Sequence, residues 1–274
     1  MNPLIVNYHD ACIYQSDLHL LMNNDWLNDA CINFEMTRLS HFKQSKVNCS
    51  STVPLPHIEF LDPSVVSFFM HQLSPGDGDD HDEFRNLYCN WGVSKSCDEL
   101  VILLVPINDN NSQGFEMFHS GSLGNHWSLL AVFVKGERIQ FFHFDSSSGY
   151  NRLPAEKVCA RLGLINQLGR EVTSLSTGNL IECNVPQQKN GYDCGVHTLA
   201  TAEALSTQWD SFDPKLLINF LSQNHVQQMA EYLEGGVDAY IGSYGSTCEM
   251  GRVKRRTMAE NIRLEAATAN ASAK

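Results

Sequence analysis

Residues 185–195 read VPQQKNGYDCG, and they lead directly into the mainly apolar segment 196–205. The Asn-Gly step at 190–191 favours a turn, and Asp193 is a residue type that often caps the start of a helix. Behind it, apolar residues recur at the helical period. We therefore expect Cys194 in the first turn of a buried helix. There the unpaired backbone N–H groups and the positive end of the helix dipole favour a thiolate.

A possible base and its orienting carboxylate lie upstream of this turn. Two segments rich in aromatic and β-branched residues, 127–134 and 138–144, are separated by a short Gly-Glu turn, which predicts a β-hairpin. His126 stands at the start of the first segment and Asp145 at the end of the second. Because an antiparallel hairpin places its open ends side by side, these two side chains should meet. With the cysteine they form a nucleophile, base and orienter set.

The alternative for Cys194 is a buried structural thiol, which describes most cysteines in proteins. The eight other cysteines of the chain are expected to follow that alternative. Cys194 differs from them because polar residues and Gly precede it, leaving its helix end open, and because a candidate base exists. His126 differs from the ten other histidines in combining a strand start, a neighbouring Trp and a hairpin partner that ends in Asp.

The combined spacing of these residues resembles the catalytic core of the Ulp, or sentrin-specific, family of cysteine proteases, which cleave ubiquitin-like modifiers. Within that family the chain looks most like the deneddylase branch. The resemblance implies an α+β fold of the papain-like, adenain/Ulp type, with a mixed β-sheet flanked by helices and the nucleophile at the N-terminus of a central helix. The pattern is His126-Trp127, then Asp145-Ser146, then Pro186-x-Gln188-x-Asn190-x-x-Asp193-Cys194-Gly195.

The resemblance also implies the roles of individual residues. Cys194, His126 and Asp145 match the catalytic positions, and Gln188 matches the side chain that stabilises the oxyanion together with the backbone N–H of the cysteine. Gln187 is adjacent and could be confused with it, but the family spacing places the role on Gln188.

Trp26, Asp29 and Trp127 are the implied substrate contacts. The two tryptophans are expected to wall a channel too narrow for a side chain, which would explain cleavage after a terminal Gly-Gly, and Trp127 is expected at the site rather than in the deep core. Without the resemblance, the residues favour another interpretation. Trp26 would pack in the core, and Asp29 would lie in the first turns of a helix capped within 23–25 and favour the helix dipole.

The function that follows is thiol-dependent hydrolysis after the C-terminal Gly-Gly of a ubiquitin-like modifier, in deneddylation and precursor processing. The expected partners are a Nedd-type modifier first, SUMO second, and their conjugates, and the protein is expected to be a monomer. A SUMO-specific protease is the first alternative, and a bacterial-effector-like member that also handles ubiquitin is a distant one. From a different class, the chain could be an inactive binder of a modifier.

Charge and composition exclude several classes of function. The formal net charge is −12, and residues 252–274 carry six Lys/Arg and two Asp/Glu, so residues 1–251 carry −16. Such an acidic body argues against nucleic-acid binding. No segment is apolar over a length that could span a bilayer, so no membrane association is expected. The segment 74–83 has five carboxylates but lacks the register of a calcium loop, so we expect a solvated loop.

The nine cysteines form an odd set without a Cys-x-x-Cys pair, which predicts reduced thiols, no metal and no cofactor. We expect one protease domain over residues 1–242. Residues 243–274 are polar, then basic, then Ala-rich, and we expect them to form a disordered tail. The expected localisation is cytoplasmic, nuclear or both, since the basic cluster is only a weak nuclear-localisation signal.

Overall fold

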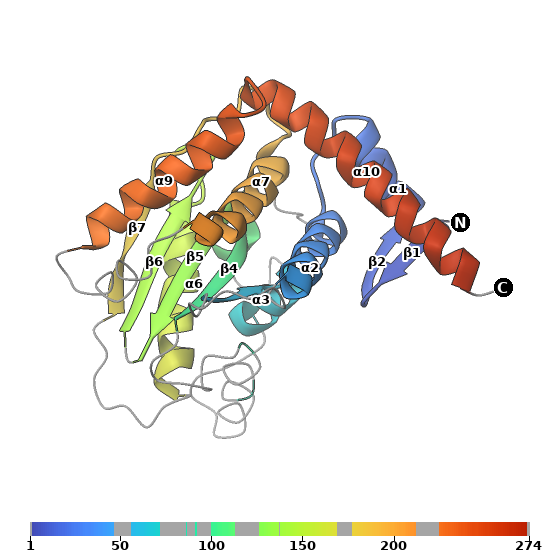
Figure 1. Cartoon of the computed structure of the whole chain (residues 1–274). Helices are drawn as coiled ribbons and strands as arrows, with labels where there is room; N and C mark the ends of the chain where they lie inside the picture. The colour runs from blue at the N-terminus through green and yellow to red at the C-terminus, as the bar shows by residue number, and fades with distance from the viewer. Residues whose placement is uncertain are drawn as a thin grey trace.

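A five-stranded mixed sheet lies at the centre of the computed structural model (Figure 1). The model describes residues 2–46, 56–71, 86, 91, 100–112, 126–136, 138–168, 177–211 and 225–272. The strand order is β3-β4-β5-β6-β7, in which β3 runs parallel to β4, β7 runs parallel to β6, and the other neighbours are antiparallel. The strands are β3 (His57–Phe60), β4 (Val101–Asn108), β5 (Trp127–Lys135), β6 (Arg138–Phe144) and β7 (Thr177–Cys183).

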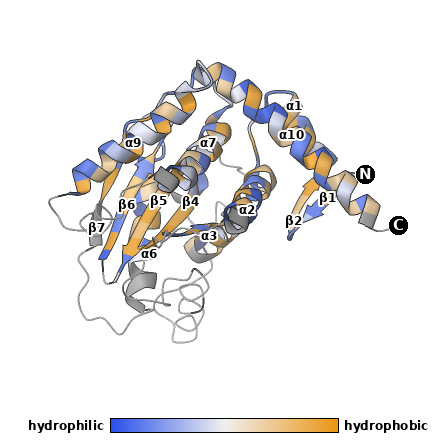
Figure 2. Cartoon of the chain, viewed as in Figure 1, coloured by the Kyte–Doolittle hydropathy of each residue, from blue (hydrophilic) through white to orange (hydrophobic). Residues whose placement is uncertain are grey.

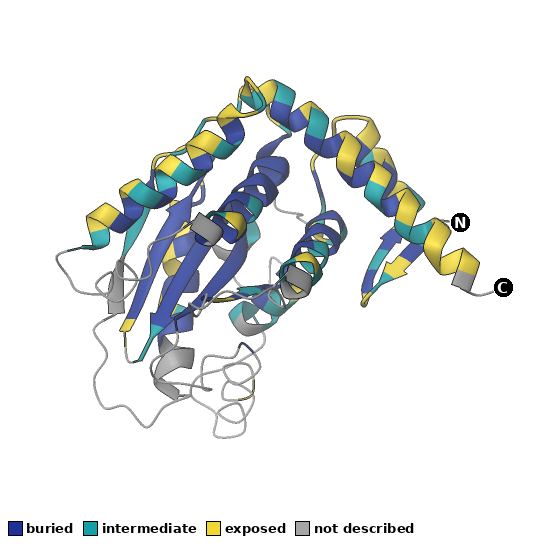
Figure 3. Cartoon of the chain, in the orientation of Figure 1, coloured by how far each residue is buried: buried dark blue, intermediate teal, exposed yellow. Residues whose placement is uncertain are grey.

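The middle strands are buried on both faces, and their alternation divides the core in two (Figures 2 and 3). In β5, Leu129, Ala131 and Phe133 enter one apolar cluster, whereas Leu130 and Val132 enter the other. The period of two in a strand makes this division unavoidable once both faces are covered. Runs of apolar residues without polar interruption, as at 101–107 in β4 and 129–134 in β5, are therefore what this sheet requires.

Helices cover both faces of the sheet (Figure 1). The first cluster contains residues of α2 (Asp29–Lys46), α7 (Cys194–Thr207) and α9 (Val226–Gly242). The second contains residues of α3 (Pro63–His71) and α6 (Arg152–Leu168). Helix α7 packs against β5, α2 and α9, and twelve of its residues are buried. This is the mixed sheet with a central helix that the sequence predicts, and the α+β prediction is confirmed.

The N-terminal segment forms a small satellite unit beside the sheet. The strands β1 (Leu4–Tyr8) and β2 (Ala11–Tyr14) pair antiparallel, and α1 (Gln15–Met22) follows directly. The 3-10 turns η1 (Asp109–Ser112) and η2 (Gln208–Ser211) follow β4 and α7. Among the described helices, none is both long enough and apolar enough to cross a bilayer.

The prediction of a disordered tail is wrong. Residues Thr247–Ser272 form the helix α10, which packs against α1, β1, α7 and α9 (Figure 1). Its buried apolar residues belong to the first cluster, and they are Met250, Met258, Ala259 and Ile262. The Ala-rich composition taken for disorder favours a helix equally well once an apolar face exists to bury. Within its basic cluster, Lys254 and Arg255 are buried and ion-paired with residues of the α7 region.

The start of α2 also differs from prediction. The helix begins at Asp29 rather than near residues 23–25, so Trp26 precedes it. The cap is Asn28, whose side-chain oxygen accepts the backbone N–H of Cys31 at 3.1 Å. Trp26 and Asp29 therefore do not share the first turns of a helix. The acidic segment 74–83 lies outside the described residues.

Candidate active site

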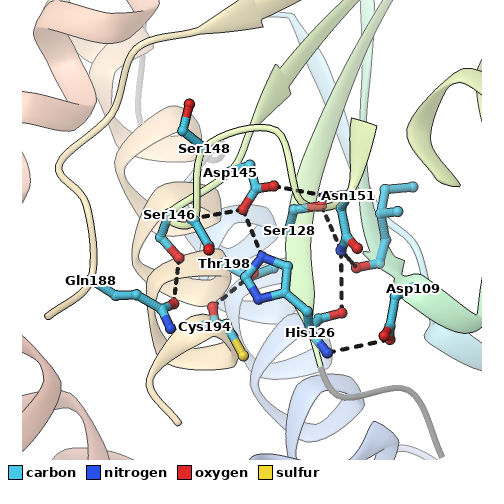
Figure 4. Close-up of polar contacts among 12 residues, drawn as sticks. Asp109, His126, Ser128, Asp145, Ser146, Ser148, Asn151, Gln188, Cys194 and Thr198 are labelled. Carbon is cyan, nitrogen blue, oxygen red and sulfur yellow. Dashed lines mark hydrogen bonds and ion pairs between the residues drawn. The ribbon is translucent and has the colours of Figure 1, made fainter. Parts of the chain in front are cut away.

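The hairpin brings His126 and Asp145 together as expected. Strands β5 and β6 pair up to Leu129 opposite Phe144, so both side chains leave the sheet at the same end. His126 Nε2 lies 2.6 Å from Asp145 Oδ1, and both residues are buried. Tyr150 lies against the imidazole, with the ring centroids 4.7 Å apart. With Nε2 engaged, Nδ1 is the ring nitrogen left to serve a third group (Figure 4).

That third group is the thiol of Cys194, the first residue of α7 (Figure 4). His126 is hydrogen-bonded to both Asp145 and Cys194. Burial disfavours the charged imidazolium, but these hydrogen bonds and the negative charges of the two partners outweigh it and raise the pKa of His126 to about 9. At neutral pH the imidazole is therefore protonated, and its positive charge lies next to the sulfur of Cys194.

Asp145 is kept ionised by its surroundings. Burial alone would raise the pKa of its carboxyl, but hydrogen bonds from His126 and from the backbone N–H groups of Asn151 and Ser147 hold the pKa below its usual value. The two backbone bonds measure 2.9 Å each, one to each carboxylate oxygen. A carboxylate fixed on both oxygens cannot rotate freely, so it holds the imidazole in one orientation.

Asn151 is the residue of this site that sequence reasoning missed. It is fully buried, and its Nδ2 lies 3.2 Å from the carbonyl oxygen of His126 and 3.1 Å from Ser128 Oγ. Its backbone N–H binds Asp145. One residue therefore ties the strand end that carries the base to the loop that carries its partner. The only sequence signal is a polar residue six positions after the Asp, which is too weak to single out.

Gln188 lies beside Cys194, and its amide is oriented by Ser146 (Figure 4). Ser146 Oγ donates to Gln188 Oε1 at 2.8 Å, and Gln188 Nε2 donates to the carbonyl oxygen of Asn190 at 2.7 Å. An amide NH2 has two hydrogens, so one remains for another acceptor. Gln187 is engaged differently, because its Nε2 binds the carbonyl oxygens of Asp145 and Val185. The two adjacent glutamines therefore differ in their hydrogen-bond partners, and the structure distinguishes them where the sequence alone does not.

The segment 26–28 connects the turn before Cys194 to strand β5. Trp26 donates its indole N–H to the carbonyl oxygen of Gly191, in the turn before the cysteine. Leu27 packs on Gly195, where an added Cβ would lie 3.0 Å from Leu27 Cβ. Only a glycine therefore lets the start of α7 approach this segment so closely. The Leu27 carbonyl oxygen accepts the indole N–H of Trp127 at 2.8 Å, which links the nucleophile turn to β5.

The two tryptophans occupy different environments. Trp26 is 52% exposed, whereas Trp127 is 3% exposed and lies in the first apolar cluster. The expectation that Trp127 lies outside the deep core is therefore wrong, because the inward-facing pattern of β5 includes it. Asp29 is exposed at the start of α2. Contact of these three residues with a substrate stays a prediction.

This contrast predicts different effects of truncating the two tryptophans. Trp127→Ala should lower the free energy of unfolding by about 3–5 kcal/mol, because it leaves a cavity in the core. Trp26→Ala should change stability little and lower kcat/KM if its exposed ring contacts substrate. Chemical denaturation measured beside the kinetics separates the two effects. Wild-type stability of Trp127→Ala would contradict its placement in the core.

The raised pKa of His126 predicts an alkaline limit to activity. Its folded-state pKa of about 9 exceeds the ordinary value of 6.5. The stabilisation from its partners is therefore complete below about pH 6.5 and lost as the pH rises through about 9. We expect kcat/KM to fall over the same upper range. Asp145→Asn removes one of the charges that raise this pKa, so its alkaline limb should move to lower pH. An unmoved limb in the kcat/KM profile would show that Asp145 does not set it.

Within the described ranges, no three His, Cys, Asp or Glu side chains cluster as a metal site would require. The described cysteines are free thiols.

Comparison with known proteins agrees with this geometry. Residues 25–243 match the model of the Ulp1 protease family, C-terminal catalytic domain. The chain is 29% identical over 227 residues to Sentrin-specific protease 8 of Homo sapiens, covering 82% of this chain and 92% of that protein. It is 31% identical over 215 residues to NEDD8-specific protease 1 of Arabidopsis thaliana, covering 76% of each.

A solved structure shares the fold. It is the C-terminal Ulp1 protease domain in complex with Smt3, the yeast ortholog of SUMO, and it superposes with a TM-score of 0.58 at 19% identity. The superposition covers 97% of this chain and 89% of that one.

Proposed function

The chain belongs to the Ulp1 protease family of cysteine peptidases, and we propose that it hydrolyses the bond after the C-terminal Gly-Gly of a NEDD8-type modifier. Both removal of the modifier from conjugates and trimming of its precursor use this one reaction. The observation that carries the proposal is the histidine hydrogen-bonded on one side to Asp145 and on the other to Cys194 at a helix N-terminus.

The proposed reaction proceeds through a thioester. The thiolate of Cys194 attacks the carbonyl carbon of the terminal glycine, and the imidazolium of His126 then protonates the leaving amine as the C–N bond breaks. His126, now neutral, takes a proton from the water that attacks the thioester. The thiolate then leaves as the C–S bond breaks, which restores the thiolate-imidazolium pair, and the modifier is released as its carboxylic acid, which loses its proton to solvent. Asp145 holds the ring and stabilises its charged form throughout.

Gln188 is proposed to stabilise the negative oxygen of each tetrahedral intermediate. Its amide is fixed by Ser146 and retains one free N–H. Donors that are already oriented lower the barrier without reorganisation. We expect Gln188→Ala to reduce kcat by about 10²–10³-fold with a small change in KM, the effect of losing one such donor. Gln187→Ala is the matched control, and an equal loss in both variants would contradict the assignment to Gln188.

The choice of modifier rests on the relatives. At 31% identity the chain is similar to a protease named for NEDD8, whereas the structure bound to a SUMO ortholog is 19% identical and informs on the fold alone. The Gly-Gly preference is supported by Trp26, whose half-exposed ring lies at the turn before Cys194. A tail that must pass beside a large ring favours residues without a Cβ.

The proposal is tested with C-terminal fluorogenic derivatives of NEDD8, SUMO and ubiquitin, assayed side by side. We expect the largest kcat/KM on the NEDD8 derivative, and none with Cys194→Ala. Fastest hydrolysis of the SUMO derivative would make the protein a SUMO protease. Saturable binding without hydrolysis of any derivative would make it an inactive binder.

A further inference from the structure

The helix α10 lies beyond the matched family segment, yet it reaches the nucleophile turn. Arg255, on its inner face, is 3% exposed. Its Nε donates to Asp193 Oδ1 at 2.7 Å, its Nη2 to the carbonyl oxygen of Tyr192 at 2.9 Å, and its Nη1 to that of Leu20 at 3.1 Å. The guanidinium also stacks on the Tyr192 ring, 5.3 Å from the centroid. A single side chain thus binds α1, the nucleophile turn and α10 together.

The packing of α10 against this turn is close. Gly251 lies one turn before Arg255, and a Cβ added there would lie 2.3 Å from Asp193 Oδ2. The glycine therefore allows the carboxylate to sit against the helix backbone. On its other side, Asp193 Oδ2 accepts Asn190 Nδ2 at 2.7 Å, and Asn190 Oδ1 accepts the backbone N–H of Asp193 at 2.9 Å. These contacts hold the turn 190–193, which immediately precedes Cys194, in place.

Asp193 does not act as an ordinary helix cap. It occupies the N-cap position of α7, but its side chain makes no hydrogen bond to the helix N–H groups. Its carboxylate faces Arg255 instead, and both side chains are almost fully buried. The carboxylate of Asp193 therefore does not compete with a thiolate or an oxyanion for the N–H groups at the start of α7. A buried carboxylate next to a thiolate would destabilise it unless a cation offsets its charge.

We propose that Arg255 is a positioning residue for the nucleophile, which neutralises the Asp193 carboxylate beside Cys194 and holds the turn 190–193 in place. Its role goes beyond the proposed function and rests on it in one respect, since Cys194 must be the nucleophile. Arg255 contacts Asp193, Tyr192 and Leu20, and it acts on Cys194 through Asp193.

Three other titratable side chains also lie near this turn. His126, just before β5, contacts Cys194 directly. His197, one turn along α7, has its pKa lowered to about 4 by burial, against the influence of Asp193, so it stays neutral above that pH. Asp17 of α1 accepts hydrogen bonds from Asn28 Nδ2 and from the backbone N–H of Tyr14. The ion pair is therefore the part of this environment that a substitution in α10 can alter.

The test follows the ultraviolet absorbance of the thiolate as a function of pH, taken as the difference between each variant and the same variant with Cys194→Ser. This readout needs no substrate. In Arg255→Gln the midpoint should rise, because the negative charge of Asp193 is then no longer offset. In the double variant Arg255→Gln/Asp193→Asn it should return toward the wild-type midpoint. Arg256→Gln, an exposed arginine on the same helix, should leave it unchanged.

Two further variants keep the test decisive if Arg255→Gln does not fold. Arg255→Lys keeps the charge but loses the fork of hydrogen bonds, so its thiolate midpoint should stay near wild type while its unfolding midpoint falls. Asp193→Asn alone should lower the thiolate midpoint. The proposal is overturned if Arg255→Gln leaves the midpoint in place, or if the double variant is shifted as far as the single one. If Asp193→Asn leaves the thiolate midpoint unchanged, the electrostatic role of the ion pair is also rejected. A normal thiolate titration without hydrolysis of any modifier would reject the proposed function instead.

Discussion

Replacing Cys194 with alanine is expected to abolish hydrolysis of every modifier derivative while binding of the modifier persists. The sulfur is the only atom of that side chain that can form the thioester, and it is the group hydrogen-bonded to His126. The side chain is small and buried, so the remaining contacts with a modifier should be kept. Turnover is measured on the fluorogenic derivative, and affinity is measured by titration with the free modifier.

Cys248→Ala is the matched control for this variant. Cys248 is an exposed thiol on α10 and belongs to neither the catalytic set nor the proposed substrate contacts, so its loss should leave kcat/KM unchanged. Turnover by Cys194→Ala above the rate measured without protein would contradict the assignment of Cys194 as the nucleophile. Loss of both turnover and affinity, with the fold intact, would show that the substitution disturbs the binding surface instead.

His126→Ala should cost nearly as much, because it removes both the acid that protonates the leaving amine and the cation that favours the thiolate. General acid-base catalysis alone contributes roughly 10²–10⁴-fold to the rate, and losing the cation that favours the thiolate lowers the rate further. Asp145→Asn should retain more activity, since orienting the base contributes less than being the base. His57→Ala, at an exposed histidine of β3, is the control. Near-normal kcat/KM in His126→Ala would remove the histidine from the mechanism.

Much of the site could be predicted because its signals are local. An Asn-Gly turn followed by Asp and an apolar helical repeat places Cys194 at a helix start, as found. A hairpin with a short turn brings His126 level with Asp145 whatever the rest of the chain does. These inferences need only the periods of helices and strands.

The position of Trp127 was predicted wrongly because adjacency in sequence says little about burial. It follows His126 directly, but successive residues of a strand point to opposite faces. The side chain of Trp127 therefore enters the core under α7, where its N–H finds the carbonyl oxygen of Leu27. Whether a residue beside a catalytic one is at the site depends on the register of its strand, which becomes visible only in the fold.

The helix α10 was missed for a different reason. Its buried apolar residues Met250, Met258 and Ile262 recur at a helical spacing, but they are few among basic, small and polar residues, so the composition outweighs the periodicity. The partners that bury Lys254 and Arg255 are Glu203 and Asp193, about fifty to sixty residues away in sequence. Long-range ion pairs leave no periodic signal. Composition alone therefore made a structural helix look like a solvated tail.

The most direct measurement uses NEDD8 that carries an electrophile at its C-terminus, incubated with the protein and followed by intact mass and peptide mapping. We expect one covalent adduct per chain, located on Cys194, formed by the wild type and absent from Cys194→Ala. This result would require a reactive thiol, a bound modifier and a tail that reaches the nucleophile, all at once. Absence of any adduct, or an adduct on another cysteine, would contradict the account of this protein as a protease that acts through Cys194.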